Sequence, residues 1–347
     1  MIRCSKCGFP NTRPGLIFKE GVCGACVNFE KRKDIDWTER RALLHQLCGE
    51  YRGKTKYDCL IPVSGGKDSY MLVKTMVEEG MNPLLITVTD SFTHTKAGTH
   101  NLRNLIETYN LNHYQYTISH DLFKRATREA FEYSGEPLKF VEYAIYTIPF
   151  SFAQMFNIPL IIYGENSEYE YGASETETFS GNHIIKNMVN KIEDERPFWE
   201  RSGIKREELN SILPTITNYS NPRLFFMSYF IPWSSVTNLE SAKKIGFKDL
   251  TGEWDRKGTI ENFEQMDSVA YMVHLWMKYP KFGFQRTADI ASRRVREGRM
   301  SLEEARKVMQ DVDPILDGMA RDDFCKTIGY TKEQFYEVVT RFEVKNV

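Results

Sequence analysis

The sequence predicts an α/β protein built around a parallel β-sheet, with a cysteine-rich segment before the sheet and a helical region after it. Short apolar runs alternate with helical patterns between residues 57 and 163, residues 1–30 are rich in Cys, Gly and Pro, and the chain is mostly helical in pattern from about residue 235. Strands that alternate with helices form right-handed βαβ units, whose ligands bind at the carboxyl ends of the strands. We therefore expect three parts: residues 1–35, 36–235 and 236–347.

The individual elements follow from apolar periodicity and from capping residues. Gly80 is expected to end the first helix of the sheet region, and Ser301 with Glu304 and Thr331 with Gln334 form capping boxes near the end of the chain. The expected strands are 57–63, 83–89, 113–118 and 159–164, and the expected helices between them are 67–80, 97–110 and about 140–157.

The composition restricts the classes of function. The chain has 347 residues, with 46 basic and 47 acidic side chains and a net charge of −1. Nucleic-acid binders usually carry a basic excess, so a nucleic-acid partner is not expected. No apolar run approaches the roughly 20 residues of a membrane helix, and the N-terminus lacks a signal-peptide core. We expect a cytoplasmic protein without a membrane partner, whose cysteines are reduced or bound to metal.

Four cysteines near the N-terminus have the spacing of a metal site. Cys4-x2-Cys7 and Cys23-x2-Cys26 are separated by fifteen residues, which is typical of zinc ribbons. Two such pairs present four thiolates in a tetrahedron and leave no open position, so the expected role is structural. Zn²⁺ would supply the folding energy of a segment too short to form its own core, and iron is the alternative metal.

A glycine loop follows the first expected strand. Residues 64–69 read Ser-Gly-Gly-Lys-Asp-Ser and precede a helix, an arrangement that presents backbone N–H groups and a positive helix end to an anion. Gly65 and Gly66 leave space for phosphate oxygens, while Lys67 supplies charge. Asp68 would repel phosphates unless it binds Mg²⁺ or caps the helix. The Walker spacing is absent.

The loop resembles the SGGxDS signature of the PP-loop ATP pyrophosphatase superfamily. The resemblance implies an adenine-nucleotide α-hydrolase-like sheet, ATP bound at the loop, and release of pyrophosphate as AMP is transferred to the substrate. It further implies a catalytic set of Lys67, Asp68 and Glu165, and Mg²⁺ held by Asp68 with Glu165 or Glu168, since "YGENSEYE" follows the fourth strand. The implied nucleotide-binding residues are Val63, Ser64, Gly65, Gly66, Lys67, Asp68, Ser69 and Val88.

The chain as a whole is similar to bacterial N-acetyl sugar amidotransferases of surface-polysaccharide and nonulosonic-acid synthesis. The cysteine pairs, "PVSGGKDSY", "YGEN" and the segment 278–305 together carry this resemblance. It implies that an acetamido sugar is converted to an acetamidino sugar through an adenylated intermediate and ammonia. A separate glutaminase with its channel-forming companion would supply the ammonia. The chain contains no GxCxG elbow and begins Met1-Ile2, so free ammonia is the other possible source.

Several alternatives stay open. Arg286 and Arg293 share one face of an expected helix, where they either bind a substrate phosphate or carboxylate or belong to a solvated basic face. The runner-up function is a PP-loop tRNA-modifying enzyme that thiolates or amidates a base, and a third is a nucleotide-binding adaptor without turnover. The basic residues near the cysteines that would contact tRNA are Arg3, Lys6, Arg13, Lys31, Arg32 and Lys33.

Overall fold

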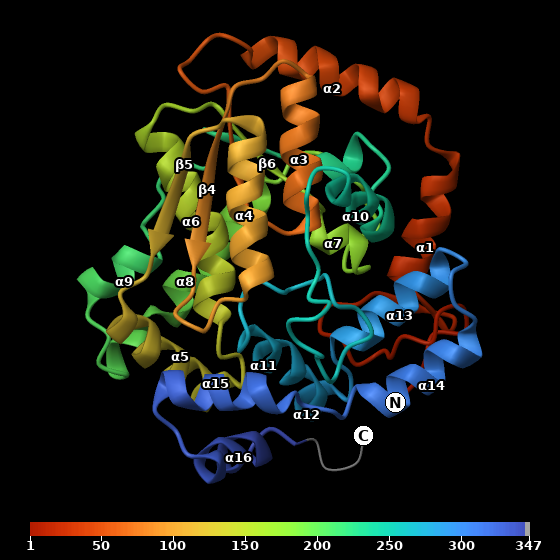
Figure 1. Ribbon diagram of the computed structural model, residues 1–347, viewed down its shortest axis with the longest axis vertical. Helices are drawn as coiled ribbons and strands as arrows, with labels where there is room; N and C mark the ends of the chain where they lie inside the picture. Colours follow the sequence, from red (N-terminus) through yellow and green to blue (C-terminus); the bar gives the residue numbers. More distant parts are fainter. Residues whose placement is uncertain (344–347) are drawn as a thin grey trace.

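A five-stranded parallel sheet forms the centre of the protein, seen in Figure 1 in a computed structural model that describes residues 1–343. The strand order is β5-β4-β3-β6-β7, and every neighbouring pair is parallel. Strands β3, β4, β5 and β6 confirm the four predicted strands, whereas β7 was not predicted. The strands are β3 (Cys59–Pro62), β4 (Pro83–Thr89), β5 (His113–Thr117), β6 (Leu160–Tyr163) and β7 (Arg223–Phe226).

Helices cover both faces of the sheet because side chains alternate along each strand. Leu60 of β3 packs in one core with α5 (His120–Ser134), α6 (Lys139–Met155), α8 (Asn182–Arg201) and α9 (Arg206–Ile212). The next residue, Ile61, packs in a second core with α2 (Trp37–Tyr51), α3 (Lys67–Glu78), α4 (Lys96–Tyr109) and α10 (Ser235–Lys243). The strand order reverses between β3 and β6, which is the switch point where such sheets bind ligands.

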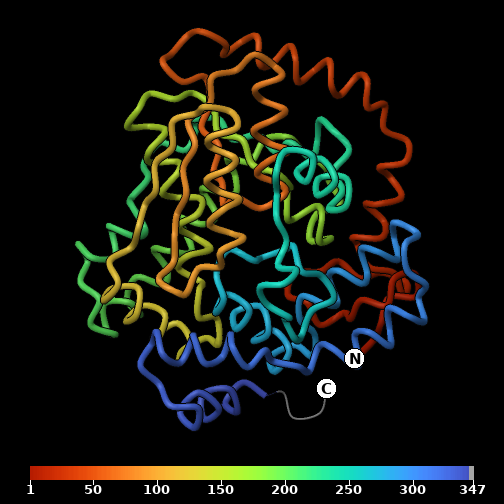
Figure 2. The backbone as a smooth tube through the Cα atoms, in the orientation of Figure 1, coloured from red at the N-terminus to blue at the C-terminus, as the bar shows by residue number. Residues whose placement is uncertain are grey.

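The N-terminal segment packs against residues 284–309 in a third core. The N-terminal segment contains β1 (Phe18–Lys19), β2 (Val22–Cys23), α1 (Gly24–Lys31) and the short helix η1 (Arg32–Asp34). It lies beside α13 (Arg286–Arg296) and α14 (Leu302–Val312), which Figure 2 shows as red chain against blue. The rings of Phe9 and Phe284 lie 5.0 Å apart at this contact. The cysteine segment is therefore packed into the protein, not appended to it.

Short helices complete the structure, and the predicted capping boxes are confirmed at Ser301 and Thr331. None of the helices within residues 1–343 is long and apolar enough to cross a membrane. The part boundaries at 35/36 and 235/236 stay predictions, and residues 344–347 of the last part lie outside the described residues. The remaining elements are α7 (Ser167–Glu170), η2 (Met227–Tyr229), α11 (Tyr271–Trp276), α12 (Lys278–Phe282), α15 (Gly318–Ile328) and α16 (Lys332–Thr340).

Candidate active site

A cavity of about 800 Å³ opens at the carboxyl ends of the central strands. It is lined by the glycine loop, the end of β4, one face of α4 and α6, Glu165 after β6, and residues 263–267. Its size is within the range of small-molecule sites, and its position agrees with the ligand site expected at the switch point.

The glycine loop is shaped to approach an anion. Gly65 has φ +82°, and a Cβ there would lie 2.6 Å from the backbone nitrogen of Leu102, so only glycine fits this turn. The Ser64 N–H donates to Ser69 Oγ at 3.1 Å, which closes the loop. The helix α3 then begins at Lys67, and its first N–H groups have no intrahelical acceptors. These features fit a phosphate group at the start of the helix.

Lys67 lies at the base of the cavity and is 5% exposed. Its ammonium nitrogen is 2.8 Å from Asp68 Oδ2 and 3.1 Å from Glu264 Oε1. Burial alone would lower the pKa of Lys67, but the charges of Glu264 and Asp68 raise it above its ordinary value. The second oxygen of Asp68 accepts a hydrogen bond from Asn238 Nδ2 at 2.7 Å. Lys67 is thus held as a cation among carboxylates.

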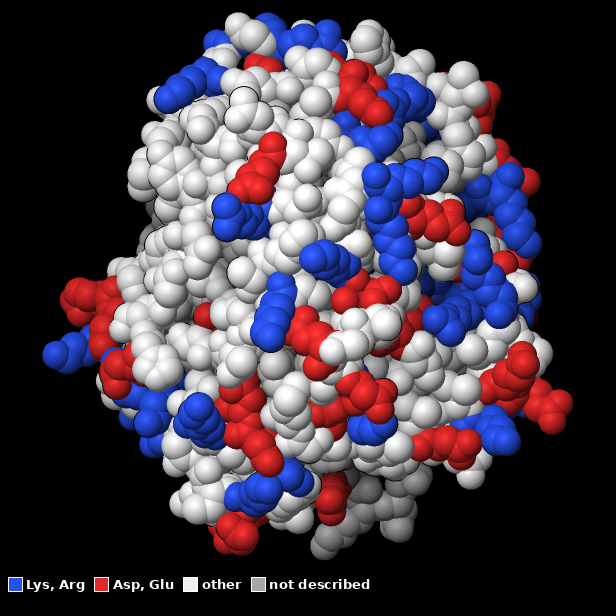
Figure 3. Space-filling model, in the orientation of Figure 1, with Lys and Arg blue, Asp and Glu red and all other residues white. Residues whose placement is uncertain are grey.

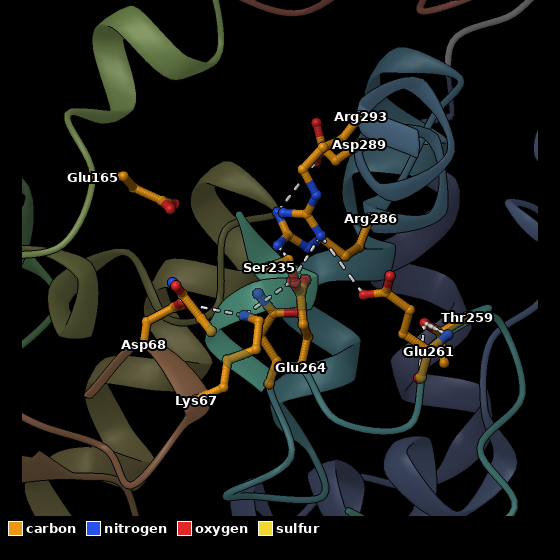
Figure 4. Close-up of polar contacts among 12 residues, drawn as sticks. Lys67, Asp68, Glu165, Ser235, Thr259, Glu261, Glu264, Arg286, Asp289 and Arg293 are labelled. Carbon is orange, nitrogen blue, oxygen red and sulfur yellow. Dashed lines mark hydrogen bonds and ion pairs between the residues drawn. The ribbon is translucent and has the colours of Figure 1, made fainter. Parts of the chain in front are cut away.

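Glu264 organises the cationic side of the cavity, and sequence reasoning missed it. Its carboxylate, 3% exposed, accepts from Arg286 Nη2 at 2.5 Å, Arg293 Nη2 at 2.7 Å and Ser235 Oγ at 2.6 Å (Figure 4). Burial opposes ionisation, but the neighbouring cations hold the pKa of Glu264 well below its usual range. We call Lys67, Arg286 and Arg293 around Glu264 the cation cluster.

The cation cluster excludes one of the two interpretations of the arginine helix, and substrate binding by Arg286 and Arg293 stays a prediction. The side chains of Arg286 and Arg293 are only 11% and 18% exposed, and both residues line the cavity. The solvated basic face is therefore wrong, because the shared face of α13 packs onto Glu264. The buried Nε of Arg286, a cavity-lining residue, has no hydrogen-bond partner among the described residues. Unpaired buried polar atoms of this kind fit a site that holds a polar ligand.

The structure separates the two candidate magnesium glutamates. Glu165 lines the cavity and accepts hydrogen bonds from Trp233 Nε1 at 3.3 Å and Tyr171 Oη at 3.4 Å. Burial and the charges of Asp68 and Glu170 raise the pKa of Glu165. Two carboxylates facing one cavity, Asp68 and Glu165, are a donor set that fits Mg²⁺. Glu168 lies outside the cavity lining, is 41% exposed and contacts His183 at 3.3 Å.

The predicted adenosine residues are only partly brought to the cavity. Val88 lines it together with Thr87 and Thr89 at the end of β4. Val63 does not: its side chain is buried in the core beneath the sheet, and its carbonyl accepts from Thr87 Oγ1 at 2.6 Å. A β-strand alternates its side chains, and here that alternation turns Val63 away from the cavity. Ser64, Gly65, Gly66 and Ser69 all line it as predicted.

The four N-terminal cysteines form one cluster, as predicted. The sulfur atoms of Cys4, Cys7, Cys23 and Cys26 lie within 4.8 Å of one another and all four residues are buried. The Cys7–Cys23 and Cys4–Cys26 sulfur distances are 3.6 and 3.9 Å. A tetrahedral Zn²⁺ with Zn–S bonds of about 2.3 Å needs sulfur separations of about 3.8 Å, so the cluster fits that ion. The identity of the metal stays a prediction.

Side chains of the cysteine segment support the cavity wall. Arg13 forms an ion pair with Asp289 of α13 and lies 4.8 Å from the centre of the Tyr171 ring. The Tyr171 hydroxyl in turn accepts from Arg286 Nη1 at 2.9 Å and donates to Glu165. Backbone contact continues the support, because the Ile17 N–H donates to the Gly172 carbonyl at 2.9 Å. The cysteine segment thereby contacts Tyr171, which hydrogen-bonds to both Glu165 and Arg286.

Ion pairs also involve some of the basic residues that the sequence predicted to contact tRNA. Arg13 is turned inward, and Arg32 is 13% exposed and paired with Glu170 and Glu177 at 3.1 and 3.2 Å. Lys33 is paired with Glu30 at 2.7 Å. Figure 3 shows Lys and Arg interspersed with Asp and Glu on one face of the molecule. Three of the six residues are thus engaged in ion pairs, which reduces the free positive charge that a phosphate backbone could bind.

Comparison with known families identifies the C-terminal part of the chain. Residues 257–347 match the family model "LPS biosynthesis protein WbpG-like, C-terminal domain". This segment contributes Glu264, Tyr271, Arg286 and Arg293 to the cavity lining. No protein of curated function matches the chain in sequence.

Three solved structures are similar to the chain, each with low sequence identity and a low TM-score. An NH3-dependent NAD synthetase from Campylobacter jejuni is 12% identical with a TM-score of 0.32, covering 51% of this chain and 92% of its own. An NMN synthetase from Francisella tularensis is 10% identical with a TM-score of 0.35, covering 90% of this chain and 100% of its own. The U34-tRNA thiolase NcsA from Methanococcus maripaludis is 12% identical with a TM-score of 0.33, covering 94% and 95%. At these scores the likenesses carry no argument about function.

Proposed function

We propose, from the premise that residues 257–347 belong to the WbpG-like C-terminal domain family, that the protein is an ATP-dependent synthetase of surface-polysaccharide biosynthesis. Its reaction converts a sugar acetamido group to an acetamidino group and releases AMP and pyrophosphate. One observation carries the proposal: Lys67 of the glycine loop and Arg286 and Arg293 of the WbpG-like domain meet on Glu264 in one cavity. The glycine loop and the WbpG-like domain therefore contribute side chains to one site.

The first step activates an unreactive amide. The acetamido oxygen attacks the α-phosphorus of ATP, the bond to the β-phosphate oxygen breaks, and negative charge grows on the departing pyrophosphate. Lys67 and the first N–H groups of α3 face this charge from the glycine loop, and Arg286 and Arg293 face it from α13. Fixed donors aimed at developing charge are usually the largest contribution to catalysis.

Metal binding and ammonia supply complete the proposal. Asp68 and Glu165 would hold Mg²⁺, which neutralises phosphate charge when bound. The Cys4–Cys26 cluster holds a structural Zn²⁺. In the second step ammonia displaces AMP from the activated carbon. Holding both reactants in the cavity supplies most of the rate increase of this step. We assign the ammonia to a separate glutaminase subunit and its channel-forming companion, since this sequence has no GxCxG elbow.

The test is acetamido-dependent formation of AMP. The protein is incubated with ATP, Mg²⁺, ammonium and a panel of UDP-N-acetyl sugars and N-acetylated nonulosonates, with Lys67→Ala as the inactive control. At least one acetamido sugar is expected to give AMP and a product one mass unit lighter, because an oxygen is replaced by NH. Absence of AMP across the panel would reject the proposal. Salt-sensitive tRNA binding with tRNA-dependent AMP formation would favour the tRNA-modifying alternative instead.

A further inference from the structure

One wall of the cavity is formed by α6 and Tyr271, and it carries the carboxylate of Glu142. Glu142 of α6 lines it beside Val141, Ile145 and Tyr271, and 49% of its side-chain surface is open. The reaction as described so far uses no group on this wall.

A buried histidine fixes Glu142. His274 of α11 is 3% exposed, and its Nε2 lies 3.0 Å from Glu142 Oε1. Its Nδ1 accepts a hydrogen bond from the Leu138 N–H at 3.3 Å, so the ring proton is on Nε2 and is donated to the carboxylate. One oxygen of Glu142 is thereby held, and no hydrogen bond from the described residues engages the other. A surface glutamate does not need such a buried support.

The surroundings keep Glu142 ionised. Burial would raise the pKa of its carboxyl, but the hydrogen bond from His274 and the charges of Lys278 and Lys139 lower it below its ordinary value. Neither lysine is within ion-pair distance of Glu142, whereas Lys139 is paired with Glu195. A carboxylate whose pKa is lowered is a weak base, so its chemistry is to pair with a cation.

We propose that Glu142, oriented by His274, is the counter-ion for the nitrogen that becomes positively charged during amidine formation. This inference rests on the proposed function. When ammonia attacks the adenylated carbon, a C–N bond forms and the attacking nitrogen becomes cationic. That nitrogen loses one proton to solvent, the C–O bond to AMP breaks with its electron pair, and the product is an amidinium cation. Glu142 accepts N–H hydrogen bonds from this cation and is a catalytic residue; His274 is its positioning residue.

A binding experiment tests the subsite without turnover. The probes are acetamidinium chloride and its neutral counterpart acetamide, titrated into the full-length protein and followed by ligand-observed NMR. The wild type is expected to bind acetamidinium about tenfold to a hundredfold more tightly, the range for a hydrogen bond between charged groups. Glu142→Gln is expected to abolish that preference, and His274→Leu to reduce it. Glu136→Gln, outside the cavity lining, is the matched control and is expected to retain it.

The ratio of the two affinities in one protein cancels any general loss of folded molecules. A wild type without preference for acetamidinium, or a Glu142→Gln protein that keeps it, would overturn the proposal. Retention of the full preference in His274→Leu would overturn the positioning role.

A kinetic experiment separates this inference from the proposed function. Acetamido-sugar-dependent exchange of pyrophosphate into ATP reports the first step alone, and amidine formation reports both steps. Glu142→Gln is expected to slow amidine formation about tenfold to a hundredfold more than it slows exchange. Equal loss of both rates would count against a role confined to the nitrogen. Failure of exchange with every acetamido sugar, together with Glu142-dependent acetamidinium binding, would reject the proposed function and keep the subsite.

Discussion

The cysteine cluster and the cation cluster are both closely packed groups of reactive side chains, but the chain assembles them differently. The four cysteines lie between residues 4 and 26 and converge through two short turns. The cation cluster joins Lys67, Glu264, Arg286 and Arg293, which come from the sheet region and from the C-terminal part. All four residues of the cysteine cluster are buried, whereas the residues of the cation cluster line a cavity. A local motif thus builds a support, and long-range packing builds the site.

Removing a cysteine ligand is expected to have the largest effect. Cys7→Ser should release the metal, and metal binding contributes about 10–16 kcal/mol in small zinc domains. Because Arg13 and Ile17 link the cysteine segment to Tyr171 and Gly172, activity should fall together with the melting temperature. Metal content by mass spectrometry and thermal unfolding measure both effects.

Cys48→Ser is the matched control, since Cys48 is a buried thiol outside the cluster. It should retain the metal. A Cys7→Ser protein with full activity would show that the cysteine segment does not support the cavity.

Glu264→Gln tests whether the cation cluster depends on its central carboxylate. The change leaves Lys67, Arg286 and Arg293 close together without their shared counter-ion. Breaking a buried ion pair costs about 3–5 kcal/mol, so the free energy of unfolding should fall by this amount in urea titrations. ATP–pyrophosphate exchange should fall as well.

Glu261→Gln is a close comparison, since Glu261 is buried and pairs with Arg294 at 2.9 Å and with Arg293 at 3.7 Å but does not line the cavity, so its loss of exchange should be smaller. Equal loss of exchange in both variants would contradict a special role for Glu264.

The sequence predicted the parts of this molecule that depend on near neighbours. The glycine loop, four strands, the capping boxes and the cysteine cluster follow from spacings of a few residues. Strand β7 was missed because Arg223–Phe226 runs directly into η2 (Met227–Tyr229), with no turn residue to mark the end of a strand. Glu264 was missed because it lies in an irregular stretch between α10 and α11, where no periodicity marks a buried side. Its proximity to Lys67 arises only from tertiary packing.

The two glutamates after β6, Glu165 and Glu168, test which carboxylate holds Mg²⁺. Both were magnesium candidates because no sequence pattern distinguishes Glu165 from Glu168, yet only Glu165 lines the cavity. Glu165→Gln is expected to raise the Mg²⁺ concentration for half-maximal activity by about tenfold or more, the effect of losing one charged ligand. Glu168→Gln should leave it unchanged. A shift with Glu168→Gln alone would assign the metal to the other carboxylate.

The smallest expected effect concerns the packing of α13 against the end of α14. Asp313 is 2% exposed there, and burial, with the charge of Asp289, raises its pKa to about 8. The folded state therefore holds a proton that the unfolded state has lost between pH 4 and 8. Stability falls as pH rises through this window. Between pH 5.5 and 7.5 the wild type should lose about 2 kcal/mol more than Asp313→Asn.

Urea titrations at the two pH values measure this difference. Parallel pH dependence in the two proteins would show that Asp313 is ionised in the folded state.

The central claim is that the glycine loop, together with Arg286 and Arg293 of the WbpG-like domain, activates an acetamido oxygen. Its most direct test uses an acetamido sugar labelled with ¹⁸O in the carbonyl, ATP, Mg²⁺ and ammonium, with mass analysis of the released nucleotide. The label is expected in the phosphate of AMP, because the C–O bond breaks after the oxygen has joined the α-phosphorus. Unlabelled AMP with ¹⁸O retained in the sugar, or label in orthophosphate, would contradict the account.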